Sequence, residues 1–579
     1  MRWIVPWTAV LLCAPVCAQE SSLHYKIQLE APGEVSDVLQ YLNLFQWQKK
    51  NRLTPELLAR EVSGLPAAAT ELLATAGYFA PTIESELRQE QNTPVVYLRV
   101  TPGPQTLVKH TSVDLQGEIN HDLEKLARVN ERLGRRGQNL ENQPFSQSSW
   151  DEYKKRSLQI LQNRDFPAAS LLSSEASIDP VTAEASYQLV LDSGPAYVFG
   201  PYTIHGLSRY PEFLIHDRVK IPAGTPYSRS ELLELQTELQ NLPQFATALV
   251  DVELSGEEPY TAPIRIDVQE VPLHRVNGSV GYSTNTLLKS ELAYRYLNLF
   301  NRGWVADSRI RLEQREQAFE QSVTLPQSRS DWEHRVWLSY LHQDLQGLDS
   351  QLYKTGVSRL KKGEEIERTF DLQYQIENRR FNDGSEERPQ TLTLNHIWTQ
   401  RKLDNRRNPR NGYLAQLEIG GASAYLLSDA TFLRLYGRGA YYHRIGQDGQ
   451  VILQGALGET FTKSPEGITS DWLFRAGGSG SVRGYDYQSL GVKSNGSVIG
   501  GQVLATASVE YQHPIVKNWK AALFVDHGGA GEAWHNLETV TGVGVGGRWN
   551  SPVGQIGFDL AYGVDLQQIR FHFAMGLVF

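Results

Sequence analysis

The chain has 579 residues and a formal net charge of −9 at pH 7, with no stripe of Lys and Arg, which argues against a nucleic-acid-binding protein. Its two cysteines, Cys13 and Cys17, lie close to the N-terminus, so the remainder has no disulfide and no cysteine metal site. Beyond this N-terminal segment the sequence has no apolar run of about eighteen residues, and therefore predicts no transmembrane helix.

Residues 1–18 predict a secretory signal peptide. Arg2 supplies a positive n-region, residues 4–14 are largely apolar, and residues 16–18 form a small-residue cleavage site. The alternative is a lipoprotein signal with an acylated Cys17, which the bulky Val16 disfavours. We therefore expect the chain to be exported.

Residues 22–275 predict three repeated α+β units. A helix, a phenylalanine and two strands recur around Phe79, Phe166 and Phe245, at intervals of about 80 residues. We place the units at residues 22–104, 105–195 and 196–275, each with the order β-α-α-β-β. One continuous α/β domain is the alternative, but it does not explain the recurrence. Small mixed domains of this kind commonly offer a sheet edge for β-augmentation.

Residues 276–579 predict a transmembrane β-barrel. Apolar and polar residues alternate, as in 556–563 and 571–579, and helical patterns are nearly absent. A soluble β-sandwich is the alternative. Arginines and glycines on the polar face suit a wet lumen better, and we interpret four aromatics as interfacial girdles: Tyr441, Tyr442, Trp472 and Trp549.

The length of this region predicts sixteen strands. About 300 residues, at about 10 per strand plus turns, hold about 14 to 18 strands. An even number lets both ends lie on one side of the membrane. The barrel must also close, because an open sheet edge in lipid leaves backbone groups unpaired.

A glycine-rich segment, Gly477–Tyr485, lies in a long connection between two predicted strands. Its Arg483 is a fork of five donors and needs acceptors. Strand alternation places Glu510 and Asp526 on the lumen face, so a loop folded into the lumen would bring Arg483 between two carboxylates. A solvated loop arginine is the alternative.

No catalytic or metal-binding constellation is apparent. The fourteen histidines are scattered without metal-ligand spacing on a helix. Residues 477–481 lack the strand–G-x-S-x-G–helix context of a nucleophile turn. We therefore expect no enzymatic activity and no cofactor.

Several of these motifs resemble those of the BamA/TamA superfamily of POTRA-bearing outer-membrane barrels. Val482-Arg483-Gly484-Tyr485 resembles the V-R-G-[FY] signature of its sixth extracellular loop. Residues 524–528 match its F-x-D-x-G strand, and Glu510 stands where the family has an inward acidic partner for the loop arginine. Residues 404–413 and 542–554 resemble its mid-barrel turn and late glycine-rich segment, and the Phe-ended last strand resembles an outer-membrane targeting signal.

The resemblance implies a function, a location and partners. Three N-terminal units, and the overall length, resemble the TamA branch more than BamA or the two-partner secretion transporters. Membership would imply insertion of unfolded β-barrel or autotransporter-type client proteins into the outer membrane. It would also imply contact with outer-membrane lipid, POTRA-like units in the periplasm, and a periplasm-spanning TamB-like protein docked on them.

The junction of the first and last barrel strands, about 276–283 and 570–579, is the expected working part. Gly278, Gly281 and Gly576 should weaken this seam, which ends at Phe579, because glycine costs strand stability and packs nothing. A seam that opens sideways would expose an edge that templates a client strand. The alternatives are a transporter that secretes a polypeptide through the lumen and a passive porin.

Overall fold

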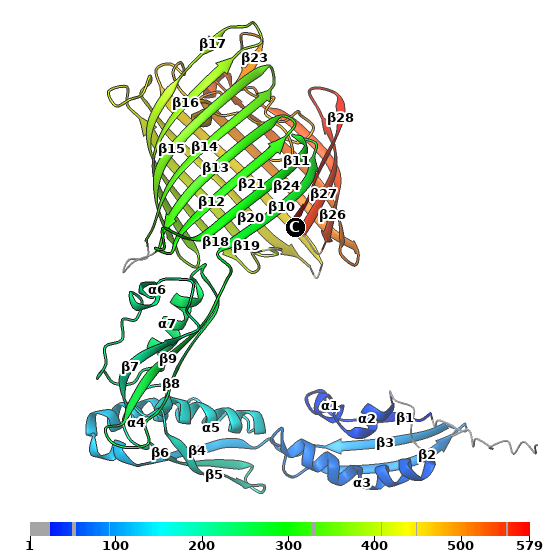
Figure 1. Ribbon diagram of the computed structural model, residues 1–579. Helices are drawn as coiled ribbons and strands as arrows, with labels where there is room; N and C mark the ends of the chain where they lie inside the picture. The colour runs from blue at the N-terminus through cyan, green and yellow to red at the C-terminus, as the bar shows by residue number, and fades with distance from the viewer. Residues whose placement is uncertain are drawn as a thin grey trace, which may run out of the picture. The chain divides into compact units, whose positions relative to one another are not determined.

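The computed structural model describes residues 24–48, 54–91, 93–326, 332–406, 408–446, 448–551 and 554–578. The predicted signal peptide and Phe579 lie outside this range. Three α+β units precede a β-barrel, and each is described by itself (Figure 1). No helix among the described residues is long and apolar enough to cross a membrane.

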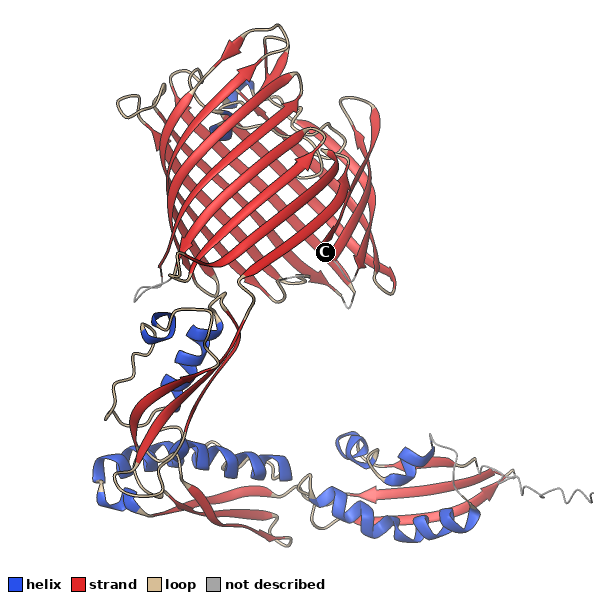
Figure 2. Cartoon of the chain, in the orientation of Figure 1, coloured by secondary structure: helices blue, strands red, loops and turns tan. Residues whose placement is uncertain are grey.

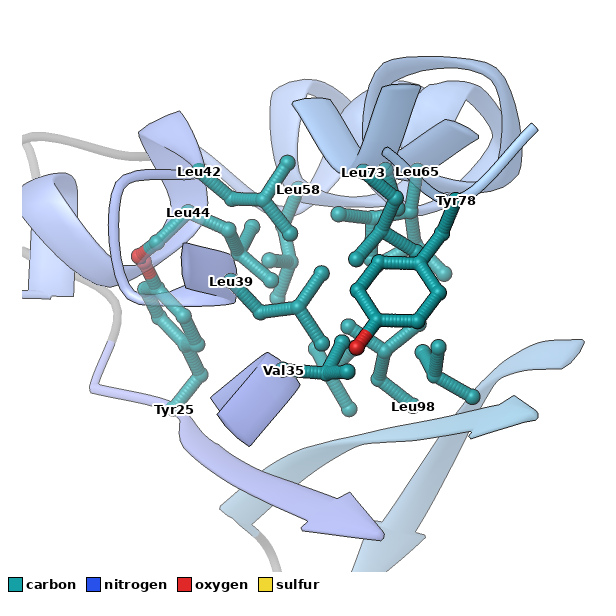
Figure 3. Close-up of a cluster of buried hydrophobic side chains, with 14 residues drawn as sticks. Tyr25, Val35, Leu39, Leu42, Leu44, Leu58, Leu65, Leu73, Tyr78 and Leu98 are labelled. Atoms are coloured by element: carbon teal, nitrogen blue, oxygen red, sulfur yellow. The ribbon is translucent and has the colours of Figure 1, made fainter. Parts of the chain in front are cut away.

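The first unit is a three-stranded sheet covered by helices. Its sheet has the order β1-β3-β2, with β1 parallel and β2 antiparallel to the central strand. Leucines from the helices pack on Leu98 of the sheet, as in the cluster around Leu39, Leu58 and Leu73 (Figure 3). The elements are β1 (Lys26–Glu30), α1 (Gly33–Leu39), α2 (Asn43–Gln48), α3 (Pro55–Ala74), β2 (Thr82–Glu90) and β3 (Thr93–Thr101).

The second and third units repeat this sheet order, as β4-β6-β5 and β7-β9-β8. The first unit has three helices instead of the two expected, because its N-terminal half folds into both α1 and α2. The second unit contains β4 (Leu107–Gln116), α4 (Leu123–Gln138), α5 (Gln147–Gln162), β5 (Ser170–Asp179) and β6 (Glu184–Asp192). The third contains β7 (Val198–His205), α6 (Phe213–His216), α7 (Arg229–Gln240), β8 (Phe245–Val252) and β9 (Thr261–Glu270).

The aromatic residue that recurs in the units is displaced by one position in the first. Gly77 and Asp165 both have positive φ, at 92° and 65°, and the next side chain enters the core. The buried counterpart of Phe166 is therefore Tyr78, and the alignment on Phe79 was wrong. Phe79 packs instead on Phe145 of the second unit, with ring centroids 5.3 Å apart.

The barrel consists of sixteen long antiparallel strands, so the expected fold class is confirmed (Figure 2). A two-residue strand, β17 (Glu386–Glu387), extends one hairpin beyond the wall. The long strands are β10 (His274–Ser283), β11 (Leu287–Leu299), β12 (Trp304–Glu313), β13 (Glu316–Leu325), β14 (Trp332–Leu345), β15 (Leu348–Lys362), β16 (Ile366–Arg380), β18 (Gln390–Leu403), β19 (Gly412–Ala422), β20 (Phe432–Ile445), β21 (Gly449–Thr462), β24 (Val503–Val516), β25 (Trp519–Gly531), β26 (Val540–Ser551), β27 (Gly554–Gly563) and β28 (Gln568–Val578).

Two of the four expected girdle aromatics face the lumen. Trp472 is only 2% exposed, because it lies in a turn of the loop that fills the lumen and packs on Phe432. Tyr442 lines a lumenal cavity. Trp549 stacks on Trp519 with centroids 5.8 Å apart, and Tyr441 is exposed on the outer surface. The girdle interpretation was therefore wrong for Trp472 and Tyr442.

Candidate functional site

The connection between β21 and β24, residues 463–502, folds into the barrel and is called the lumenal loop below. It contains the short strands β22 (Val492–Ser494) and β23 (Ser497–Ile499), which form a hairpin. Val482, Arg483 and Tyr485 of this loop are all buried. The V-R-G-Y part of the glycine-rich segment is therefore packed against the wall, whereas Ser479 and Gly480 are exposed.

Arg483 contacts both carboxylates that strand alternation placed in the lumen. Its Nε and Nη2 donate to the two oxygens of Asp526 at 2.7 and 2.9 Å, and Nη1 donates to Oε2 of Glu510 at 2.7 Å. The backbone N–H of Arg483 also donates to Asp526, at 3.0 Å. The guanidinium lies 3.4 Å from the centroid of the Phe524 ring, a cation–π contact. The arginine is thus held by both its side chain and its backbone.

A second arginine completes this cluster, and the sequence interpretation missed it. Arg548 of β26 donates to both oxygens of Glu510, at 3.1 and 2.7 Å, and its Nη1 donates to Asp559 at 2.6 Å. Arg483 also reaches Asp559, at 3.3 Å. Strand alternation could have revealed it, because it places Arg548 of β26 and Asp559 of β27 on the lumen face of two successive strands.

The cluster of Arg483, Glu510, Asp526, Arg548 and Asp559 contains three carboxylates and two guanidiniums, all buried. Desolvating such charges is costly, and the cost is offset only when geometry and hydrogen bonds are good. Bidentate, charge-assisted bonds of the lengths found here meet that condition. Removing one member would leave the others buried without their counter-charge.

The first part of the lumenal loop has a separate attachment on the opposite wall. Glu377 of β16 is 0% exposed and accepts from the Ser470 backbone N–H and hydroxyl, both at 2.7 Å. Arg379 pairs with Glu377 at 2.9 Å and donates to the Ile468 carbonyl. Lys354 of β15 pairs with Asp471 at 2.8 Å. The loop is therefore held at its base and at its tip.

The lumenal loop also touches the strands on both sides of the seam. The Gly484 N–H donates to Nε2 of His572 on β28 at 2.9 Å, and Asp486 pairs with Arg570 of the same strand. On the other side, Asn285 in the β10–β11 turn donates to Ser479 at 3.0 Å. One loop thus links the last strand to the first hairpin from inside the barrel.

The seam itself has few strand pairs. Up to Val578, the last described residue, β10 pairs with β28 at five positions, from Ser279 opposite Val578 to Ser283 opposite Ala574, but with β11 at ten. Gly281 lies directly opposite Gly576. Gly278 lies opposite Leu292 of β11 and outside the described pairing with β28, and Phe579 lies outside the described residues.

The mid-barrel turn between β18 and β19 is held by Asp404. Its Oδ1 accepts the backbone N–H groups of Asn405 and Arg410, at 2.8 and 2.9 Å. Gly412 begins β19 with φ of 115°, where any Cβ would overlap the Lys402 carbonyl oxygen. This motif therefore has a structural explanation within the turn.

The third unit is joined to the connection between β11 and β12 by buried amides. Gln244, 1% exposed, donates to the Gly303 carbonyl at 2.8 Å, and Asn298 donates to the Arg209 carbonyl at 2.8 Å. Glu270 accepts the N–H groups of residues 208–210 at 2.7 to 3.2 Å. Burial opposes the charge on Glu270, but these N–H groups and the Ser208 hydroxyl outweigh it and lower the pKa of the carboxyl.

Comparison with known proteins gives one family and several related folds. The Omp85 superfamily domain matches residues 273–579. The structure is similar to BamA from Haemophilus ducreyi lacking POTRA domains 1–3, with a TM-score of 0.70 and 16% identity over 82% of this chain and 100% of that chain. CdiB from Acinetobacter baumannii matches with a TM-score of 0.46 and 13% identity, over 94% of this chain and 98% of that chain. At 16% identity, the similarity to BamA concerns the fold alone.

Proposed function

Because the chain belongs to the Omp85 superfamily, we propose that it inserts other β-barrel proteins into the outer membrane by opening its seam. A sixteen-stranded barrel of this superfamily implies an outer-membrane location. More specifically, we propose a TamA-like role, in which the protein assembles unfolded autotransporter-type clients without bond chemistry or cofactor.

The observation that carries the proposal is the imbalance between the two neighbours of β10. Five pairs with β28 against ten with β11 make the seam the side of β10 that separates at the lower cost. Gly281 opposite Gly576 adds no cross-strand side-chain contact there, and such contacts stabilise sheets. Opening at this point would expose the β10 edge while β11 stays attached.

An exposed β10 edge supplies what a client strand needs. Its free N–H and C=O groups would pair with an extended client segment, as in other cases of β-augmentation. Closure of the client on itself would then restore the seam, because unpaired edges in lipid are costly. The lumenal loop, attached to both sides of the seam, would hold the rest of the wall in register meanwhile.

The three N-terminal units support the proposal of a TamA-like role. Their number favours the TamA branch, and we propose a TamB-like periplasm-spanning protein as the partner that binds them. β2 is exposed along most of its length and forms one edge of the first sheet, so its backbone is open to an incoming strand. A photo-crosslinker at Arg88 on this strand would test the docking, whereas Tyr78 is buried and unsuitable. If the crosslinker captured client proteins but never a TamB-like protein, the proposal of a TamB-like partner would be contradicted.

A disulfide across the seam tests the mechanism. We expect Gly281→Cys/Gly576→Cys to stop insertion of an unfolded autotransporter barrel into proteoliposomes, and reductant to restore it. The matched control is Ala415→Cys/Gly439→Cys, which locks the directly paired positions of β19 and β20. Client insertion that continues at the normal rate through a fully oxidised seam would end the lateral-opening proposal.

Secretion of a polypeptide through the lumen is the competing function. The lumenal loop weighs against it, because its base and tip are bound to opposite parts of the wall. Single-channel conductance of the purified full chain separates the two. Large, stable currents that rise when a secreted polypeptide is added would favour the transporter.

A further inference from the structure

The loop between β19 and β20, residues 423–431, exposes three consecutive large apolar side chains. Tyr425, Leu426 and Leu427 are 95%, 62% and 71% exposed. Contiguous exposed apolar side chains are typical of surfaces that contact a partner or a membrane. We propose that this loop, called the apolar finger below, inserts into the outer leaflet of the membrane around the barrel. The inference adds a lipid contact to the membrane location and does not depend on the seam.

The apolar finger is held in place by its polar residues. Asp429 donates its N–H to the Gln390 carbonyl at 3.0 Å, and its carboxylate accepts the Gln390 N–H at 2.9 Å. Ser428 accepts the Leu392 N–H at 2.8 Å. Leu427 has a φ of 51°, which is rare for a leucine and is retained only where the surroundings impose it. The exposure of the three side chains is thus a fixed feature of the loop.

The finger continues the lipid-facing surface of the barrel. A bond of 2.9 Å from the Ala424 N–H to the Thr431 hydroxyl closes its base, two positions before Leu433. Leu433 faces outward on β20, is exposed, and pairs with the exposed Phe461 of β21. The apolar side chains of the finger therefore follow directly on outward-facing apolar side chains at the same end of these strands.

The chemistry of the finger favours lipid over a protein partner. The one charged side chain of the finger, Asp429, is bound to Gln390 of β18, so Tyr425, Leu426 and Leu427 lack the polar rim that is usual at protein interfaces. A tyrosine beside two leucines combines an apolar body with one polar group, which suits the membrane interface.

β19 and β20 are the ninth and tenth of the sixteen long strands counted from β10, which places the finger on the wall opposite the seam.

Fluorescence quenching tests the insertion. In full-length protein with Cys13 and Cys17 replaced by serine, Leu426→Cys is labelled with the environment-sensitive dye NBD. The protein is reconstituted in phosphatidylcholine vesicles in which part of the lipid carries a nitroxide near the glycerol backbone. Leu433→Cys is the membrane-facing reference, and Glu538→Cys, exposed in the β25–β26 loop, is the aqueous reference. Heat-modifiable mobility in electrophoresis verifies that each variant is folded.

We expect the dye at position 426 to be quenched by the nitroxide lipid to an extent close to that at 433 and several times that at 538. Quenching equal to that at 538, with full access to an aqueous quencher, would overturn the proposal. Protection from both quenchers, or a signal that depends on the protein-to-lipid ratio, would overturn it in favour of a protein contact or a second copy of the chain.

Discussion

Gly542 lies beneath the backbone of Arg483, so close that a Cβ on Gly542 would overlap the Arg483 carbonyl oxygen. The Arg483 carbonyl oxygen cannot move away freely, because the arginine is fixed to Asp526 through both its backbone and its guanidinium. The lumenal loop therefore requires a bare backbone at this point of β26. The late glycine-rich segment of the sequence thus has a steric reason.

We predict that Gly542→Ala displaces the tip of the lumenal loop. Overpacking of this kind costs about 1–3 kcal/mol, and the loop should become accessible to protease. Protease cleavage mapped by mass spectrometry measures the displacement. The control is Gly439→Ala, where the nearest atom to a Cβ is the Leu414 carbonyl oxygen at 3.5 Å, an ordinary contact. Equal cleavage in both variants would show that Gly542 has no special role.

Arg483→Ala should have a larger effect. Breaking a buried ion pair by removing one partner costs about 3–5 kcal/mol, because Asp526 then lies buried without its counter-charge. We expect a lower urea midpoint for the refolded barrel and a loop open to protease. Arg380→Ala is the comparison, since its pair with Asp349 is exposed and worth about 0–1 kcal/mol. A midpoint for Arg483→Ala that matches Arg380→Ala would mean that the cluster does not stabilise the barrel.

The contacts between the lumenal loop and β28 predict a variant that frees the loop from the last strand. His572→Leu removes the acceptor for the Gly484 N–H, and Arg570→Ala removes the pair with Asp486. We expect the double variant to increase the spread of spin-label distances between position 493, exposed in the lumenal loop, and β28. The quantity measured is the width of the distance distribution in pulsed EPR. A similar double variant at Arg309 and Arg295, whose partly exposed pairs lie on β11, β12 and β13 and do not involve the lumenal loop, should leave the distribution unchanged.

Glu270 gives the junction of the third unit and the barrel a defined pH dependence. Its pKa is lowered in the folded protein, so its contribution is complete above the unfolded pKa of about 4.3 and declines as the pH falls through the lower folded value. We expect Glu270→Gln to speed amide exchange at residues 208–210 at pH 7, relative to the native chain. At a pH below the folded pKa the two proteins should exchange alike. A difference that persists unchanged at low pH would mean that the carboxylate charge is not what holds these amides.

The large-scale architecture could be predicted because it rests on periodicity. Strand alternation indicated the lumen positions of Glu510 and Asp526, and length with the closure requirement indicated sixteen strands. Trp472 could not be placed in this way. It lies in a long loop without regular alternation, so its burial is apparent only in the folded structure. Glu377 of β16 accepts from Ser470, which lies 93 residues away in a loop. The partners of Arg483 could be predicted because they lie on strands with a regular alternation, whereas the burial of Trp472 and the contact of Ser470 depend on how the loop itself packs.

The sheet order of the N-terminal units has a mechanical consequence. In the first two units the entering strand lies parallel to the leaving strand, β1 beside β3 and β4 beside β6. A pull on the start of β1, opposed at the end of β3, therefore loads the hydrogen bonds between them in shear, so that all must break together. Each of these two units is consequently built to carry tension along the chain instead of unzipping under it. A partner that pulls on the N-terminal end would have its force delivered to the next unit with the sheets intact.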